Sequence, residues 1–107
     1  MNSVIHVTND NFEAEVLRSP IPVLADFWSP GCAPCARIAP ILEEFAQEYA
    51  GRMRIAKINA DEETALASRF MITAVPTIII FRNGAIFRKR LGALPKPQLK
   101  DLFEDII

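Results

Sequence analysis

The sequence predicts a single α/β domain over residues 1–107, built as a small mixed β-sheet flanked by helices. Three observations lead to this class. A strand, a helix and a second strand follow one another over residues 23–58, an Asn83-Gly84 pair joins two further strand-like runs, and an amphipathic helical pattern closes the chain. At 107 residues, 50% of them hydrophobic, the chain is long enough for a core without disulfide support.

The N-terminal part predicts a strand, a helix and a second strand. Residues 4–7 form a short strand candidate, and the polar residues 8–11 supply side chains expected to cap a helix. The apolar face of that helix consists of Phe12, Val16 and Leu17. The nearly continuous apolar run 23–28 is typical of a central strand covered on both faces.

A long amphipathic helix comes next and leads into another strand. Its apolar residues recur at helical spacing and are Ile38, Ile41, Leu42, Phe45 and Tyr49. Pro40 should kink this helix, and Gly51 ends it. With residues 53–58 as the following strand, residues 23–58 form a unit of two parallel strands with a right-handed crossover. The turn before the helix then lies beyond the carboxyl end of a central strand, where open α/β sheets place their sites.

The C-terminal half predicts a short helix, a hairpin and a final helix. Asp61 or Glu62 is the expected cap of the short helix. The apolar residues of this helix are Ala65, Leu66 and Phe70. Residues 75–81 begin with Val-Pro-Thr and continue as an apolar strand. Asn83-Gly84 is a strong hairpin signal, so residues 85–91 should return antiparallel to that strand.

The last segment begins at Gly92, which is expected to mark a bulge or a close approach of two backbone segments. Pro97 opens the final helix near its first turn. The apolar residues of this helix are Leu99, Leu102, Phe103 and Ile106. A strand–helix–strand unit, a hairpin and a helix in this order describe a small mixed sheet flanked by helices.

Both cysteines, Cys32 and Cys35, lie at the start of the long helix, near enough to bond to each other. Unpaired backbone N–H groups and the positive end of the helix dipole favour a thiolate there, which lowers the thiol pKa below the value of about 8.5 for free cysteine. Pro34 suits the first helical turn, where its missing N–H costs nothing and its fixed φ stiffens the link between the sulfurs. The segment predicts a dithiol/disulfide switch.

Two other interpretations of the cysteine pair are open. A zinc site needs four ligands, whereas the chain has no third cysteine and its single histidine, His6, lies in a distant strand-like segment. A purely structural disulfide would close a very short loop and add little stability, and a cytosolic chain would keep it reduced. Neither interpretation is favoured by the residues.

Charge and hydropathy exclude several classes of partner. The net charge of −1, with acids and bases interspersed, gives no electrostatic reason to expect binding of nucleic acid or of an anionic membrane. The longest apolar runs, such as residues 78–81, are too short to span a bilayer. Residues 1–6 show no basic stretch followed by an apolar one, so a cytoplasmic protein is expected.

The sequence resembles the thioredoxin family over essentially its whole length. The resemblance is carried by residues 26–28 (Asp-Phe-Trp), Cys32-x-Pro34-Cys35, residues 38–40 (Ile-Ala-Pro), Lys57, residues 75–77, Asn83-Gly84 and Gly92-Ala93. It implies the thioredoxin fold, with a five-stranded mixed sheet of order 1-3-2-4-5, four flanking helices and a cis Val75–Pro76 bond. It also implies a monomeric protein-disulfide reductase without a bound cofactor or metal. Its partners would be disulfide-containing proteins and a thioredoxin reductase-like electron donor that uses NADPH or, in some systems, ferredoxin.

Two residues depart from the family motif Trp-Cys-Gly-Pro-Cys. Gly31 replaces the tryptophan and removes a large apolar surface where a partner would dock, so the range of partners is expected to change. Ala33 replaces the glycine, restricts the backbone between the sulfurs and is expected to shift the reduction potential in an unspecified direction. In addition, Pro95 stands where the family often has a capping serine, which bears on helix stability.

The resemblance suggests a role for each residue of the site. Cys32, the more exposed sulfur, would attack a substrate disulfide, and Cys35 would then resolve the mixed disulfide. Asp26 would be a buried acid of raised pKa that relays a proton to or from Cys35, with Lys57 as its charge partner. The alternative for Asp26 is a solvated carboxylate at the strand end, or one satisfied by a structural hydrogen bond.

The expected substrate-contacting residues surround Cys32. Trp28 would pack under the turn and support docking, Val75 would pair through its backbone with an extended substrate segment, and Pro76 would shape the site. The full expected set is Trp28, Gly31, Ala33, Pro34, Val75, Pro76, Gly92 and Ala93.

Two alternative functions are open beside reduction. One is an oxidant or isomerase that uses the same cysteine chemistry in another direction. The other is a binding module in which the cysteines are incidental.

Overall fold

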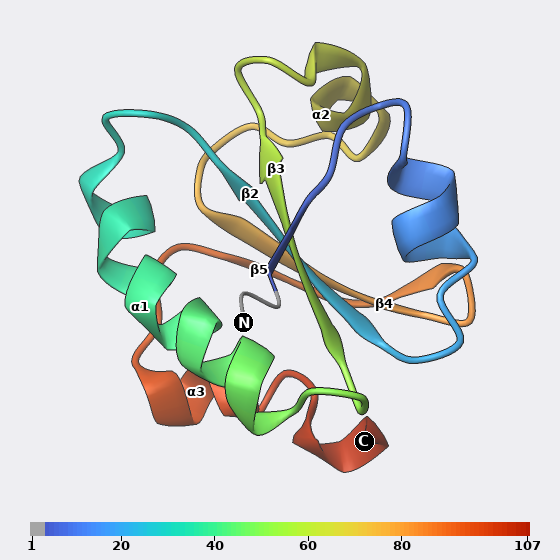
Figure 1. Cartoon of the computed structure of the whole chain (residues 1–107). Coiled ribbons are helices and arrows are strands. Elements are labelled where there is room, and N and C mark those ends of the chain that lie inside the picture. Colours follow the sequence, from blue (N-terminus) through green and yellow to red (C-terminus); the bar gives the residue numbers. More distant parts are fainter. Residues whose placement is uncertain (1–3) are drawn as a thin grey trace.

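The computed structural model describes residues 4–107 as a five-stranded sheet between two layers of helices (Figure 1). The strands are β1 (Val4–His6), β2 (Val23–Trp28), β3 (Arg54–Asn59), β4 (Thr77–Arg82) and β5 (Ala85–Leu91). Their order across the sheet is β1-β3-β2-β4-β5, as the family resemblance implied. β3 is parallel to both β1 and β2, whereas β4 is antiparallel to β2 and to β5. The expectation about a leader falls partly on residues 1–3, which lie outside the described residues.

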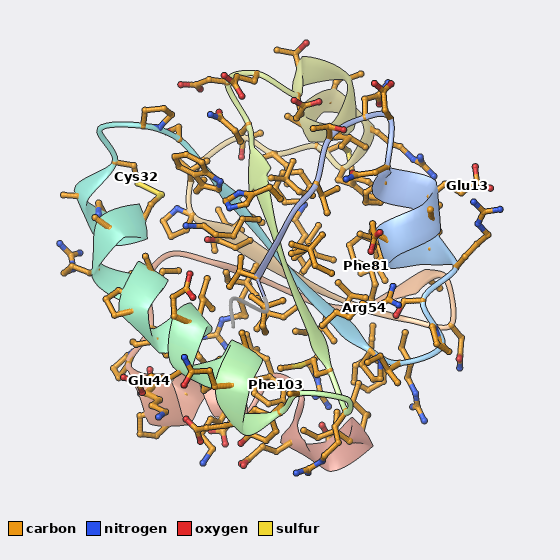
Figure 2. The ribbon with its side chains drawn as sticks, in the orientation of Figure 1. Glu13, Cys32, Glu44, Arg54, Phe81 and Phe103 are labelled. Atoms are coloured by element: carbon orange, nitrogen blue, oxygen red, sulfur yellow. A yellow bond between two sulfur atoms is a disulfide. The ribbon has the colours of Figure 1, made fainter. Side chains whose placement is uncertain are left out.

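The helical segments are η1 (Glu13–Leu17), α1 (Ala33–Glu48), α2 (Thr64–Arg69), α3 (Lys96–Lys100) and the 3₁₀ turn η2 (Glu104–Ile106). They pack on both faces of the sheet, because alternate residues of the central strands point to opposite sides. Leu24 of β2 contributes to a core with α1 and α3, which includes Phe103, whereas Phe27 contributes to a core with η1 and α2, which includes Phe81. Figure 2 labels Phe103 and Phe81, one from each core. No helix among residues 4–107 is long and apolar enough to cross a membrane.

Several elements match the expectation closely. β2 covers the predicted residues, and the hairpin turn at Asn83 and Gly84 has φ values of 53° and 78°, as a two-residue turn of this type requires. β3 is displaced by one residue from the predicted strand. α1 runs continuously through Pro40 and ends at Glu48, before Gly51.

The predicted helix caps were wrong. No side chain caps η1; Asn11 instead accepts the N–H of Thr8 at 2.7 Å and donates to the carbonyl of His6. The helix α2 starts at Thr64, and its N-terminus also has no side-chain cap. Asn59 Oδ1 accepts hydrogen bonds from the N–H groups of Asp61 and Glu62. The side chains of Asn11 and Asn59 therefore form hydrogen bonds within the loops that precede the helices, and they do not cap the helices.

Two further expectations need correction. Gly92 does not mark a bulge, because the register shift of the hairpin lies between Ile80 and Phe81, but it does mark a close approach of two backbone segments: its N–H donates to the carbonyl of Pro76 at 2.8 Å. Gly92 is required for its φ of 89°. The final helix is shorter than predicted and breaks after Lys100 into a turn and η2, although Leu99, Leu102 and Phe103 are buried as expected.

Candidate active site

The two cysteines lie where β2 gives way to α1. Gly31 makes the turn possible because its φ is 77°, a conformation that residues with a Cβ rarely adopt. The N–H of Cys32 donates to the carbonyl of Ser29 at 3.3 Å. Cys32 is the N-cap of α1, Ala33 and Pro34 form its first two positions, and Cys35 follows within the first turn.

The structure contains a Cys32–Cys35 disulfide, with the two Cα atoms 5.3 Å apart. Figure 2 shows the disulfide as a yellow bond beside the label of Cys32, at the N-terminal end of α1. Cys32 is half-buried, whereas Cys35 is only 6% exposed. The backbone N–H of Cys35 donates to Cys32 Sγ at 3.2 Å, so the helix terminus offers the Cys32 sulfur a donor that would stabilise negative charge.

A cis peptide bond joins Val75 to Pro76 on the other side of the disulfide, as the resemblance implied. Cys32 Sγ lies 3.9 Å from the carbonyl oxygen of Val75. The carbonyl of Pro76 accepts the N–H of Gly92 at 2.8 Å, which ties the end of β5 to this loop. Val75, Pro76 and Gly92 are therefore held together beside Cys32.

Asp26 is buried in the sheet, with 1% of its surface exposed. It pairs in register with Lys57 of β3 and Ile78 of β4, and neither of its carboxylate oxygens has a hydrogen-bond partner among residues 4–107. The interpretation as a solvated carboxylate is therefore wrong, and no described residue supplies the hydrogen bond that a structural carboxylate would need. Burial raises the pKa of Asp26 from 3.8 to about 7, and the positive charge of Lys57 opposes part of that rise.

Strand alternation brings the acid toward the disulfide. Asp26 is two residues after Leu24, which packs against α1, so Asp26 and then Trp28 face the same layer. Lys57 follows Ile55 of that same core by two residues. The Lys57 ammonium lies 5.0 Å from the centre of the Trp28 ring, and the indole Nε1 of Trp28 has no partner among the described residues.

A pocket of about 180 Å³ collects five of the predicted site residues, namely Trp28, Gly31, Cys32, Cys35 and Lys57. It also includes four residues that were not predicted as site residues: Ser29, Pro30, Ala36 and Ala39. Ala36 and Ala39 could have been found from their spacing, because each lies four positions after a cysteine on one helix face.

Three predicted residues lie elsewhere around the site. Ala33 is exposed and Pro34 half-buried, and neither lines this pocket. Ala93 lines a separate pocket of about 300 Å³ between α1 and the start of α3, so the residues predicted to contact substrate do not all line one cavity. Within residues 4–107, no three side chains of His, Cys, Asp or Glu gather as metal ligands.

Comparison with known proteins places these features in a family. The family model described as thioredoxin matches residues 3–105. The chain is 41% identical to thioredoxin from Haemophilus influenzae over the full length of both chains. It is 46% identical to thioredoxin from Acidithiobacillus ferridurans, over 92% of this chain and 91% of the relative. With thioredoxin 1 from a Nostoc species it shares 41% identity over 97% of each chain.

Proposed function

Because this chain belongs to the thioredoxin family and is a protein thiol–disulfide oxidoreductase, we propose that it works as a general reductant of disulfides in other proteins. One observation carries this proposal: the Cys32–Cys35 pair at the start of α1, with one sulfur half-buried and the other almost fully covered. A substrate reaches only the first sulfur, and the second is held within bonding distance of it.

The proposed cycle uses the two sulfurs in sequence. The Cys32 thiolate attacks a substrate disulfide, forms a mixed disulfide and displaces one substrate thiolate. Cys35 then attacks Cys32 Sγ, which forms the internal disulfide and releases the second substrate thiolate. Two electrons pass from the dithiol to the substrate, and the two protons of the dithiol pass to the two product thiols.

Electrons return to the protein from a partner. We propose a thioredoxin reductase-like donor, and no bound cofactor or metal, since the dithiol alone supplies the chemistry of the cycle. We also propose a cytoplasmic location, where thiols are kept reduced. We further propose that residues 1–107 form a single domain that works as a monomer; the one sheet and the two cores of residues 4–107 support the single domain.

The direction of electron flow is tested by equilibrating the protein with glutathione or dithiol buffers of known potential. We expect a midpoint below the cytosolic glutathione poise of about −220 to −260 mV, because only then does the dithiol reduce typical protein disulfides. A midpoint of about −120 mV would instead identify an oxidant.

The Cys32→Ser/Cys35→Ser double variant tests the alternative of a binding module. As a reductase, this variant should lose all biological activity. Full activity in that variant would identify a binding module.

We also propose that Asp26 is the proton acceptor in the resolving step. Its pKa of about 7 makes it partly ionised at neutral pH, and its carboxylate has no competing hydrogen bond within the described residues. The ionised form would take the proton of the Cys35 thiol, through a water molecule. Lys57 would hold the pKa of Asp26 below the value that burial alone would give.

Asp26→Asn is expected to slow the resolving step about 10²-fold at pH 8, since the variant has no carboxylate to accept the proton. The reduced protein is mixed with 5,5′-dithiobis(2-nitrobenzoate), and the two successive releases of thionitrobenzoate report attack and resolution. In the unmodified protein the second rate should show an inflection near pH 7 that Asp26→Asn lacks. Identical profiles of the second release in the two proteins would contradict a proton role.

A further inference from the structure

The pocket beside the disulfide contains a positively charged group as well as the reacting sulfurs. Lys57, Cys32 and Cys35 all line this space of about 180 Å³. Gly31 lines it without a side chain, and a Cβ at that position would meet no atom within 4 Å. The volume is below the 300 Å³ or so at which pockets accept drug-sized ligands, so it fits one half of a small disulfide or a single amino-acid side chain.

Lys57 forms no ion pair among the described residues. Its in-register neighbour Asp26 is largely uncharged below pH 7 and therefore neutralises it only partly. Lys57 also lines a second pocket, whose lining includes Glu62 and Glu63. Glu63 Oε1 already accepts the N–H of Asn9 at 2.9 Å, and Glu62 is exposed. The ammonium of Lys57 lies over the face of the Trp28 ring, and this contact leaves its positive charge available to an anion.

We propose that this pocket selects disulfides that carry a carboxylate close to the sulfur attacked by Cys32, and that Lys57 recognises that carboxylate. The inference rests on the proposed function as a disulfide reductase and names the class of substrate that its site prefers. An ammonium at the wall of a small, partly apolar pocket attracts a carboxylate more strongly than it would in bulk water. Two kinds of substrate have a carboxylate close to the attacked sulfur: a small organic acid that contains a disulfide, and a peptide with an acidic residue next to a cystine.

The reaction is the one proposed above, with the substrate written as R–S–S–R. Cys32 Sγ bonds to the sulfur nearer the bound carboxylate and expels the other R–S⁻. Cys35 then displaces the bound half from Cys32. The products are two molecules of R–SH and the Cys32–Cys35 disulfide, so the protein loses two electrons and two protons and the substrate gains both.

The first experiment compares dithiodiglycolate with its uncharged bis-amide as substrates of the fully reduced protein in single-turnover reactions. The ratio of the two second-order rate constants should fall about fivefold in Lys57→Gln and be retained in Lys57→Arg. The acid-to-amide ratio is measured within each variant and then compared between variants. The intrinsic difference in leaving-group reactivity is the same in every variant, so it cancels in this comparison. Any effect of Lys57 on Asp26 acts on both substrates and cancels within each ratio. The preference of the unmodified protein should also weaken as sodium chloride is raised from about 0.01 to 1 M.

A second pair of variants tests the pocket without altering Lys57. Ala36 lines the same pocket and is exposed, so a longer side chain is tolerated there. Ala36→Glu introduces a competing carboxylate into the pocket that Lys57 lines and should lower the acid-to-amide ratio, whereas the isosteric Ala36→Gln should preserve it. In a second arm of the experiment, the substrates are disulfide-linked peptides with either Glu or Gln next to the cysteine, and their rates of reduction are compared. A preference for Glu in this arm extends the inference to protein substrates, whereas a preference confined to dithiodiglycolate limits it to small acids.

The outcomes separate this inference from the proposed function. If Lys57→Gln leaves the acid-to-amide ratio unchanged while the bis-amide is still reduced, the carboxylate preference is wrong and the reductase function stands. If the unmodified protein reduces neither the two small disulfides nor the peptide disulfides, both fail together.

Discussion

Replacing Asp26 with asparagine is expected to raise the free energy of unfolding of the oxidised protein by about 4 kcal/mol at pH 8 to 9, and to change it little at pH 4. The reason is the position of Asp26, which is 1% exposed and lacks a hydrogen-bond partner for either carboxylate oxygen within residues 4–107. An ionised carboxylate in such a place destabilises the folded state relative to the unfolded chain, where water surrounds it. Asparagine has the same shape and never ionises in this range.

The sign follows from the two pKa values. In the unfolded chain Asp26 titrates near its usual 3.8, whereas in the folded protein its pKa is about 7. Between these values the folded state binds more protons than the unfolded state, so the stability of the unmodified protein falls as the pH rises from about 4 to about 7 and then levels off. Each pKa unit is worth 1.36 kcal/mol, and the rise from 3.8 to about 7 therefore corresponds to about 4 kcal/mol.

The measurement is urea or guanidinium unfolding of the oxidised forms at several pH values from 4 to 9. Asp10→Asn is the matched control, because Asp10 is exposed and the same chemical change there should move the unfolding free energy by less than about 0.5 kcal/mol. A constant difference between Asp26→Asn and the unmodified protein at every pH would show that this carboxyl titrates in the folded state as it does in the unfolded chain.

The expected gain in the free energy of unfolding of Asp26→Asn means that the natural Asp26 destabilises the folded protein at high pH. Natural sequences tolerate a destabilising group when activity depends on it, and a half-ionised acid near a resolving cysteine is such a group. The two Asp26 experiments are therefore linked. If Asp26→Asn is more stable at high pH and also slow in resolution, the same buried charge explains the loss of stability and the gain in rate.

The strands and the position of the cysteine turn could be predicted from the sequence because each depends on a local signal. The run 23–28 is apolar enough to require cover on both faces, and Asn83-Gly84 favours one turn type through backbone sterics alone. The helix ends could not be predicted in the same way. Asn11 and Asn59 use their side chains on neighbouring loop N–H groups, a choice that depends on how the loops fold back on the sheet.

The chemical properties of the site depend on contacts between distant residues, so the sequence alone indicated them less well. Asp26 and Lys57 lie 31 positions apart and meet only through the register of β2 with β3. The burial that raises the pKa of Asp26 depends on the helical layer that packs on its face of the sheet. Likewise, the sequence predicted a bulge or a close backbone approach at Gly92, but it did not indicate that Gly92 has a φ of 89° or that its N–H donates to the carbonyl of Pro76. The resemblance to a family supplied the strand order and the cis bond, which no local pattern determines.

Cys35→Ser is expected to trap the mixed disulfide with a substrate, and Cys32→Ser is expected to abolish reduction. The structure gives the two sulfurs different surroundings: Cys32 is half-buried and receives the N–H of Cys35 at 3.2 Å, whereas Cys35 is 6% exposed. A thiolate at the N-cap is stabilised by that donor and by the helix dipole, so its attack on a substrate needs no second cysteine. Resolution, by contrast, requires the second sulfur.

Each variant is reduced, mixed with an excess of 5,5′-dithiobis(2-nitrobenzoate) and analysed by absorbance and intact mass. Cys35→Ser should release one equivalent of thionitrobenzoate rapidly and retain the other as a covalent adduct. Cys32→Ser should react more slowly by about two orders of magnitude or more, because its remaining thiol is covered and lacks the helix-terminal donor. Cys35→Ala should behave like Cys35→Ser, which separates loss of the thiol from effects of the serine hydroxyl. Adducts formed at equal rates in Cys32→Ser and Cys35→Ser would mean that exposure and the helix terminus do not distinguish the sulfurs, and the order of attack would have to be abandoned.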